Sequence, residues 1–77
     1  MKKKWKNICG LTIKALRLKS GLTQLELSQR LRKECNVDVD RAGIAKIETG
    51  ARCVLDYELL AISRALRTTM KKIVELG

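Results

Sequence analysis

The sequence predicts an all-α protein, and three features of its composition and residue spacing support this fold class. Its 77 residues include no proline and no phenylalanine, and aromatic residues make up 3%. The hydrophobic share of 45% therefore comes mainly from leucine, isoleucine, valine and alanine, a mixture that favours helices over a β-sandwich. Apolar residues also recur at the spacings of three and four that are typical of helices. A chain of this length forms one small domain, because separate cores need far longer chains.

The first predicted helix covers residues 8–19. Cys9, Ile13 and Leu16 follow one another at offsets of four and three, which places them on one helical face. Gly21 is expected to end this helix, because glycine readily adopts the left-handed conformation found at helix ends.

The second predicted helix starts after Thr23, which has Glu26 three residues later. This pair forms a capping box, in which each side chain bonds to the backbone amide of the other residue. The helix is expected to run over residues 24–33 or a little further, into a less helical stretch at 35–39. The inward residues expected here are Leu27, Leu31, Val37 and Val39.

The third predicted helix covers residues 41–49. Asp40 is a strong candidate for its N-cap, because a short carboxylate accepts bonds from the unpaired amides of a first turn. Ile44 and Ile47, three residues apart, are expected to face the core. Gly50 is expected to end the helix.

Two further helices are predicted in the last third of the chain. Asp56 is expected to cap a fourth helix, and a short fifth helix is expected over residues 69–76. The inward residues expected in these helices are Leu59, Ile62, Leu66, Met70, Ile73 and Val74.

The formal charge of +9 is high for so small a domain and points to a polyanion partner, with nucleic acid the first candidate. The first 20 residues carry seven lysines and arginines and no acidic residue. Residues 1–7 are interpreted as a basic N-terminal tail that is either solvated or in loose contact with phosphates. Residues 8–77 are interpreted as the domain.

Other classes of protein are disfavoured by what the sequence lacks. Cys9, Cys35 and Cys53 are odd in number, form no C-x-x-C pair and have no histidine beside them, so neither a zinc site nor a disulfide framework is expected. Small buried thiols in a reducing cytosol are the simpler interpretation. No apolar run is long enough to span a membrane. Without a nucleophile motif or a glycine-rich loop, we expect no enzyme, no cofactor and no small-molecule ligand.

Two consecutive capped helices with a short polar link are typical of a helix-turn-helix, although the spacing alone is a weak signal. The residue types at particular positions strengthen the helix-turn-helix signal. They are Leu16-Arg17, Gly21-Leu22-Thr23-Gln24, Leu27 and Ile44-Ala45-Lys46-Ile47-Glu48-Thr49-Gly50.

This pattern resembles the L-R-x-x-x-G-L-T-Q-x-x-L and I-x-x-I-E-x-G signature of the XRE, or Cro/CI-type, family of transcriptional regulators. The resemblance covers nearly everything after residue 8. It implies a compact five-helix lambda-repressor-like DNA-binding domain, with the helix-turn-helix formed by the second and third helices. It also implies a bacterial or phage-encoded protein of the cytoplasm, with double-stranded DNA as its partner and repression as its expected role.

The resemblance implies that the helix at 41–49 reads bases in the major groove. Its outward positions are Arg41, Ala42, Ala45 and Lys46. Arginine can make two parallel hydrogen bonds to guanine, whereas alanine can contact a thymine methyl group or permit close approach.

The remaining site residues also follow from the family. Thr23 and Gln24, at the positive end of the second helix, and Arg52 are expected to contact the DNA backbone. Each has a structural alternative, since Thr23 is a cap in any case and exposed polar residues are usually only solvated. Arg17 and Glu48 are expected to form a partly buried ion pair with a structural role.

The chain departs from the family between Leu31 and Ile44, where six extra residues lengthen the second helix, the turn or both. The exact pose of the third helix depends on this insertion. The basic residues near it, Arg30, Arg32 and Lys33, are either a solvated face or additional phosphate contacts.

A second apolar stripe lies along the first helix and consists of Leu11, Ala15, Leu18 and Leu22. Packing against the C-terminal helix is the default explanation, and a patch for a protein partner is the alternative, to which outward Leu25 adds. The alternative function is therefore an antitoxin or adaptor on the same fold. A homodimer, at least on DNA, is expected through residues 70–76.

Overall fold

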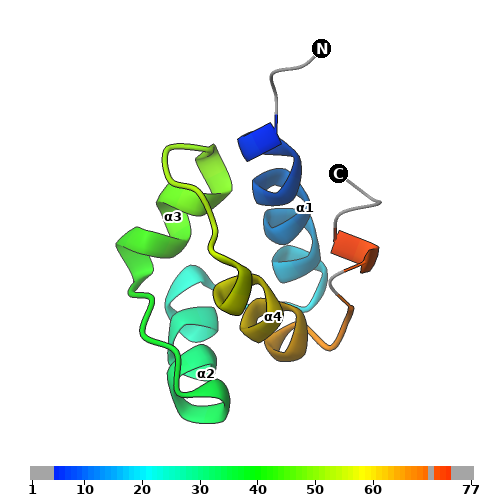
Figure 1. The fold of residues 1–77 in the computed structure, drawn as a ribbon. Helices are drawn as coiled ribbons and strands as arrows, with labels where there is room; N and C mark the ends of the chain where they lie inside the picture. The colour runs from blue at the N-terminus through cyan, green and yellow to red at the C-terminus, as the bar shows by residue number, and fades with distance from the viewer. Residues whose placement is uncertain (1–4, 70, 74–77) are drawn as a thin grey trace.

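A computed structural model describes residues 5–69 and 71–73, and all regular structure in these residues is helical (Figure 1). The helices are α1 (Trp5–Lys19), α2 (Gln24–Cys35), α3 (Arg41–Thr49) and α4 (Asp56–Ala65), followed by a helical turn at residues 71–73. The all-α prediction is confirmed. Helix α3 packs against α1 and α2, and α2 also packs against α4.

Helix α1 starts at Trp5, three residues before the predicted start, and ends at Lys19 as expected. Gly21 follows with a φ of 75°, so the predicted left-handed end is present. Gly10 is buried where α1 crosses the C-terminal end of α3, and a Cβ atom there would collide with the backbone oxygen of Ile47. Glycine at this position allows the two helices to approach each other closely.

Helix α2 begins with the predicted capping box. The Thr23 hydroxyl accepts the Glu26 amide proton at 3.0 Å, and the Thr23 amide donates to the Glu26 carboxylate at 2.8 Å. The helix ends at Cys35, because Asn36 adopts the left-handed conformation with a φ of 56°. Of the two valines expected to point inward after this end, Val39 is buried and Val37 packs partly against the core.

Helix α3 has the predicted bounds and both predicted caps. The Asp40 carboxylate accepts the Gly43 amide proton at 2.7 Å, and Gly50 closes the helix with a φ of 82°. Gly43 fits beneath this cap because it lacks a Cβ atom, which would lie 3.1 Å from the Asp40 carboxylate and 2.9 Å from Val39. The entry of the chain into α3 is therefore fixed by local packing.

The predicted cap of α4 is wrong by one position. Leu55 is the N-cap, and Asp56 is the first helical residue. The Leu55 amide donates to the Glu58 carboxylate at 3.0 Å, so the first turn of α4 is capped from within the helix. Aspartate is favourable in a first helical turn as well as at the cap, so its presence alone does not fix the boundary. Of the predicted fifth helix, Ile73 is fully buried, whereas Met70 and Val74 lie outside the described residues.

The core lies between the helices and consists of aliphatic side chains. Its buried members are Ile13, Leu27, Leu31, Val39, Ile44, Ile47, Leu59, Ala61, Ile62, Ala65, Leu66 and Ile73. The expected burial of the cysteines is wrong for Cys53, which is exposed, and only partly correct for Cys9 and Cys35, which pack against the core from its edge.

The default explanation for the second stripe of α1 is wrong for three of its four residues. Leu11, Ala15 and Leu18 are exposed, and Leu22 is partly buried against the core. Helix α1 turns Ile13 and Arg17 toward the core and α3, which directs this stripe to the other side of the helix.

Candidate nucleic-acid interface

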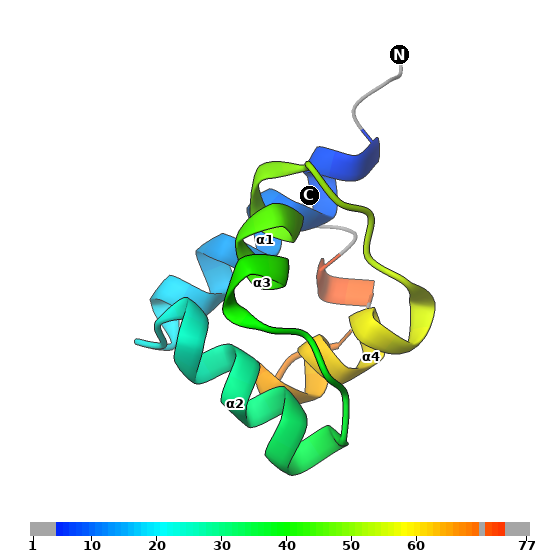
Figure 2. The ribbon, with the colours of Figure 1, turned by 90° about the vertical axis from the view of Figure 1, so that its left-hand side faces the viewer.

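The outward face of α3 carries the four positions that the sequence singled out. Arg41, Ala42 and Lys46 are exposed, and Ala45 is partly buried. Figure 2 shows the molecule from the side on which α2 and α3 lie in front of α1. The linker at residues 36–40 runs from the end of α2 to the start of α3. Because Ile44 and Ile47 are buried, the opposite side of α3 is available to a ligand.

The chemistry of this face suits the major groove of DNA. An α-helix fits that groove, and the residues near its N-terminus reach base edges. Arg41 is the first residue of α3 and brings five hydrogen-bond donors, while the short side chains of Ala42 and Ala45 leave room for a groove wall. Lys46 adds a second cation one turn further along.

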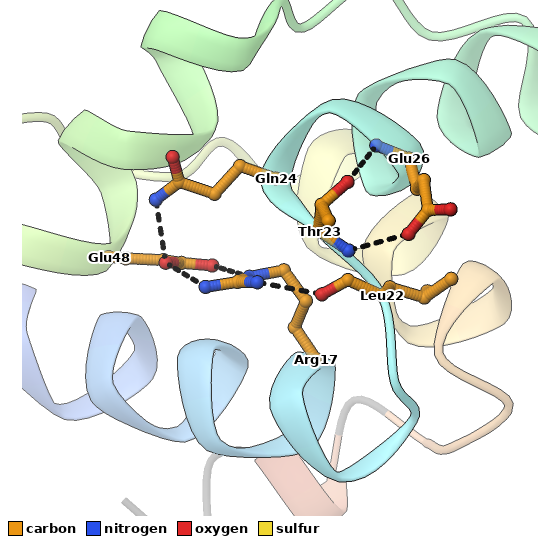
Figure 3. A network of polar contacts seen from close by, with 6 residues as sticks. All are labelled: Arg17, Leu22, Thr23, Gln24, Glu26 and Glu48. Carbon is orange, nitrogen blue, oxygen red and sulfur yellow. Dashed lines mark hydrogen bonds and ion pairs between the residues drawn. The ribbon is translucent and has the colours of Figure 1, made fainter.

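A buried ion pair anchors the C-terminal end of α3 (Figure 3). The Arg17 guanidinium donates to both carboxylate oxygens of Glu48, from Nε at 2.6 Å and from Nη2 at 3.1 Å. The two side chains are 7% and 2% exposed, so water screens this pair little. The Arg17 Nη1 also donates to the Leu22 carbonyl at 2.7 Å, which ties the end of α1 to the turn that follows it.

Gln24 belongs to the same network. Its side-chain amide donates to Glu48 Oε1 at 3.1 Å, so the first residue of α2 is bonded to the end of α3. Glu48 is thus neutralised by Arg17 and bonded to Gln24, which reduces the repulsion that its charge would exert on a nearby phosphate. The network joins α1, α2 and α3 at one point.

Thr23 lies beside this network, at the positive end of α2. Its side chain is exposed, and its hydroxyl oxygen is engaged in the capping box. Thr23 and Gln24, the two residues expected to contact phosphate at the start of α2, therefore each have a role within the fold.

Arg52 has a partner that the sequence pattern did not predict. Its Nη1 and Nη2 donate to the two carboxylate oxygens of Glu58 at 2.9 and 2.6 Å. The Arg52 side chain is 33% exposed and that of Glu58 is 3% exposed. The hydrogen bond from Arg52 holds the pKa of Glu58 below its ordinary value, although burial opposes this, and the same bond raises the pKa of Arg52.

Glu58 thus has two roles, since it caps α4 at Leu55 and holds Arg52 across the α3–α4 connection. Leu55 and Glu58 are three residues apart, which is the spacing at which the acidic residue of a capping box bonds back to the N-cap amide. This spacing is the sequence signal that could have predicted the cap at Leu55.

The stretch between Leu31 and Ile44 consists of the last turn of α2, the non-helical linker at 36–40 and the start of α3. Its basic residues have different surroundings. Arg30 donates to the Ala65 carbonyl at 3.0 Å, which ties α2 to α4. Arg32 and Asp38 lie 3.9 Å apart as a solvent-exposed pair.

Neither a metal site nor a membrane helix is found within residues 5–69 and 71–73. No group of three His, Cys, Asp or Glu side chains there could hold a metal ion. None of the helices described there is long and apolar enough to cross a bilayer.

Comparison with known proteins identifies a family for this chain. A family model described as helix-turn-helix matches residues 13–73, which is most of the chain. Searches of curated proteins and of solved structures gave no match. The matched region contains α2, α3 and the Arg17–Glu48 pair that joins α3 to α1. The chain therefore belongs to the helix-turn-helix family of the XRE type, a family of DNA-binding proteins.

Proposed function

We propose that the protein is a transcriptional repressor that binds a specific sequence of double-stranded DNA, with α3 lying in the major groove. The observation that carries this proposal is the exposed face of α3, which has Arg41 and Lys46 on a helix that is capped at both ends. The helix is also held from behind by the buried pair of Arg17 and Glu48. A rigid element with outward cations is suited to reading base edges.

Within this proposal, α3 reads the bases and its surroundings hold the backbone. Arg41, Ala42, Ala45 and Lys46 face the base edges. Thr23 and Gln24 contact phosphate at the N-terminus of α2, where backbone amides and the helix dipole favour an anion.

Arg52 contacts phosphate through the exposed third of its side chain while Glu58 keeps it in position. The pair of Arg17 and Glu48 supports the fold and does not touch DNA.

The repressor acts in the cytoplasm of a bacterium, on chromosomal or phage operators, and it binds them as a homodimer. A symmetric dimer would place its two copies of α3 about 34 Å apart, which is one turn of DNA. The proposal requires no enzymatic activity, cofactor or small-molecule ligand.

Selection from randomised duplex DNA tests this proposal, because it reports both binding and the symmetry of the site. On the selected operator, Arg41→Ala should weaken binding by about 1 to 3 kcal/mol and relax preference at one base position. Arg64→Ala, which removes the same charge from an exposed position on α4, is the matched control and should leave base preference unchanged. Repression is tested separately, with a reporter gene placed behind that operator.

The salt dependence of binding gives a second test. The logarithm of the binding constant should fall with the logarithm of salt concentration, by about 0.9 for each phosphate contacted. Failure to select any site, or a response that does not change with salt, would contradict the proposal and favour the alternative of an antitoxin or adaptor.

A further inference from the structure

An apolar stripe on α1 serves neither the core nor the proposed DNA contacts. Leu11 and Leu18 lie two helical turns apart on one face and are 62% and 58% exposed, with exposed Ala15 between them. Together they form a short apolar stripe with a large side chain at each end. Apolar side chains gathered on one exposed face, unlike isolated ones, indicate a site of interaction.

The remaining faces of α1 are already engaged. Gly10 meets the backbone of α3 at Ile47, Ile13 is buried in the core, and Arg17 is bonded to Glu48. The stripe therefore points away from the surface that holds the helices together. It shares no residue with the proposed base-reading set on α3.

Charge defines the kind of partner that this stripe fits. Lys14 and Lys19 are exposed and flank the stripe on its two sides, as the helical spacing of these positions requires. No acidic residue occurs anywhere in the first 20 residues. An apolar ridge between two positive edges is complementary to an apolar ridge between two negative edges.

We propose that the α1 stripe, defined as Leu11, Ala15 and Leu18 with its flanking Lys14 and Lys19, binds an acidic amphipathic helix of a partner protein. The partner helix packs its leucine face along the stripe and places glutamate or aspartate opposite each lysine. The stripe is short, so the complex belongs to the small, transient class of interfaces.

Three other occupants fit the same surface less well. A second copy of this chain would bring its own lysines against Lys14 and Lys19, and no acid nearby in sequence offsets the repulsion. A DNA backbone would satisfy the lysines and leave the leucines in contact with phosphate. An anionic membrane would gain little, because insertion strength grows with apolar area and the stripe offers two leucines and one alanine.

The test uses three synthetic helical peptides and the full chain, with binding followed by fluorescence anisotropy. The first peptide has leucines at heptad positions flanked by glutamates, the second has lysines in place of the glutamates, and the third has serines in place of the leucines. The first should bind, and the other two should bind at least about ten-fold more weakly.

Variants of the chain assign this binding to the stripe. Leu11→Ser with Leu18→Ser should weaken binding of the first peptide by at least about ten-fold. Leu60→Ser, which removes a 41% exposed leucine from α4, is the matched control and should bind it as the parent does. Lys14→Glu with Lys19→Glu should reverse the preference toward the lysine peptide. Circular dichroism should show that each variant keeps its helices, because all the replaced side chains are exposed.

Each other outcome overturns the proposal. These outcomes are no binding of the glutamate peptide, equal binding of the glutamate and lysine peptides, and equal binding by the parent and the double leucine variant. Self-association that the double leucine variant abolishes would assign the stripe to a second copy. Binding to phosphatidylglycerol vesicles without binding to the glutamate peptide would assign it to a membrane. DNA affinity of the double leucine variant is a separate readout, so failure here leaves the proposed repressor function standing.

Discussion

Replacing Arg17 by methionine tests how strongly the buried ion pair holds α3 in place. Methionine retains an unbranched stem of similar length, so the substitution removes the charge and the hydrogen bonds while keeping much of the packing. Three bonds are lost, two to Glu48 and one to the Leu22 carbonyl. Glu48 is then a carboxylate with a 2% exposed side chain, bonded only to the amide of Gln24 among the contacts of this network.

The expected cost follows from this geometry. Removing one partner of a buried pair leaves an uncompensated charge and costs about 3 to 5 kcal/mol. A domain of this length has a total stability of about 4 to 12 kcal/mol, so the variant would lose a large share of it. The thermal midpoint should fall by about 12 °C or more.

Urea unfolding followed by far-ultraviolet circular dichroism measures this loss, and a double-mutant cycle isolates the pair. Glu48→Gln removes the other charge, and the double variant should be more stable than the sum of the single effects by about 2 kcal/mol or more. Arg32→Met is the matched control, because Arg32 and its partner Asp38 have side chains that are 76% and 84% exposed. Its cost should stay within about 1 kcal/mol.

Two results would refute this reasoning. The first is an Arg17→Met variant that loses less than about 1 kcal/mol, the range of an exposed pair. The second is an additive cycle, in which the two substitutions act independently.

Three further predictions concern the crossing of α1 and α3, the Glu58 carboxylate that binds Arg52, and the cysteine thiols. Gly10→Ala should lower the free energy of unfolding, because the added methyl group meets the Ile47 backbone. Without that collision, the better helix propensity of alanine would raise the free energy of unfolding by about 1 kcal/mol. The sign of the change in urea unfolding therefore shows whether the collision occurs. Glu58→Gln should be less stable than the parent at neutral pH, and the difference in stability should shrink below pH 4.5. The reason is that the pKa of Glu58 in the folded state lies below its ordinary value of 4.5. The stability that this shift contributes is therefore present above pH 4.5 and is lost as the pH falls through the folded pKa. Urea unfolding at neutral and acidic pH tests this, and a constant difference would contradict it. Iodoacetamide should modify exposed Cys53 at least about ten-fold faster than Cys9, whose pKa is raised by burial, as mass spectrometry over time would show; equal rates would contradict this.

The parts of the fold that the sequence predicts well are those in which local chemistry and the apolar pattern agree. Asp40 and Gly50 delimit α3, and both caps have the geometry that their residue types favour. The capping box of Thr23 and Glu26 likewise fixes the start of α2. Where cap, pattern and stop signal coincide, a helix can be placed to the residue.

Sequence predicts a boundary less exactly where two local signals compete, and it does not predict which face of a helix another element covers. Asp56 is a typical cap, but Glu58 bonds to the Leu55 amide and also binds Arg52, which moves the start of α4 back by one residue. The expected burial of Leu11 and Leu18 required a covering element, and helical periodicity does not say which of two apolar stripes is covered.

In the candidate site, too, the features set by local pattern can be predicted, and those set by contacts between distant residues cannot. The exposure of Arg41 and Lys46 follows from the buried positions of α3, since residues opposite a core face must point outward. The bond from Gln24 to Glu48 does not follow from any local pattern, because its two ends are 24 residues apart.

The anchoring of α3 explains how the chain accommodates its long connection from α2. The C-terminal half of α3 is fixed by contacts to α1 and to the first residue of α2, through Gly10, Arg17 and Gln24, and none of these lies in the 36–40 linker. The N-terminal end is fixed by the Asp40 cap over Gly43, which depends on residues beside the helix and not on the length of the connection. An insertion between the two helices can therefore change the surface around α3 while leaving its attachment to the core intact.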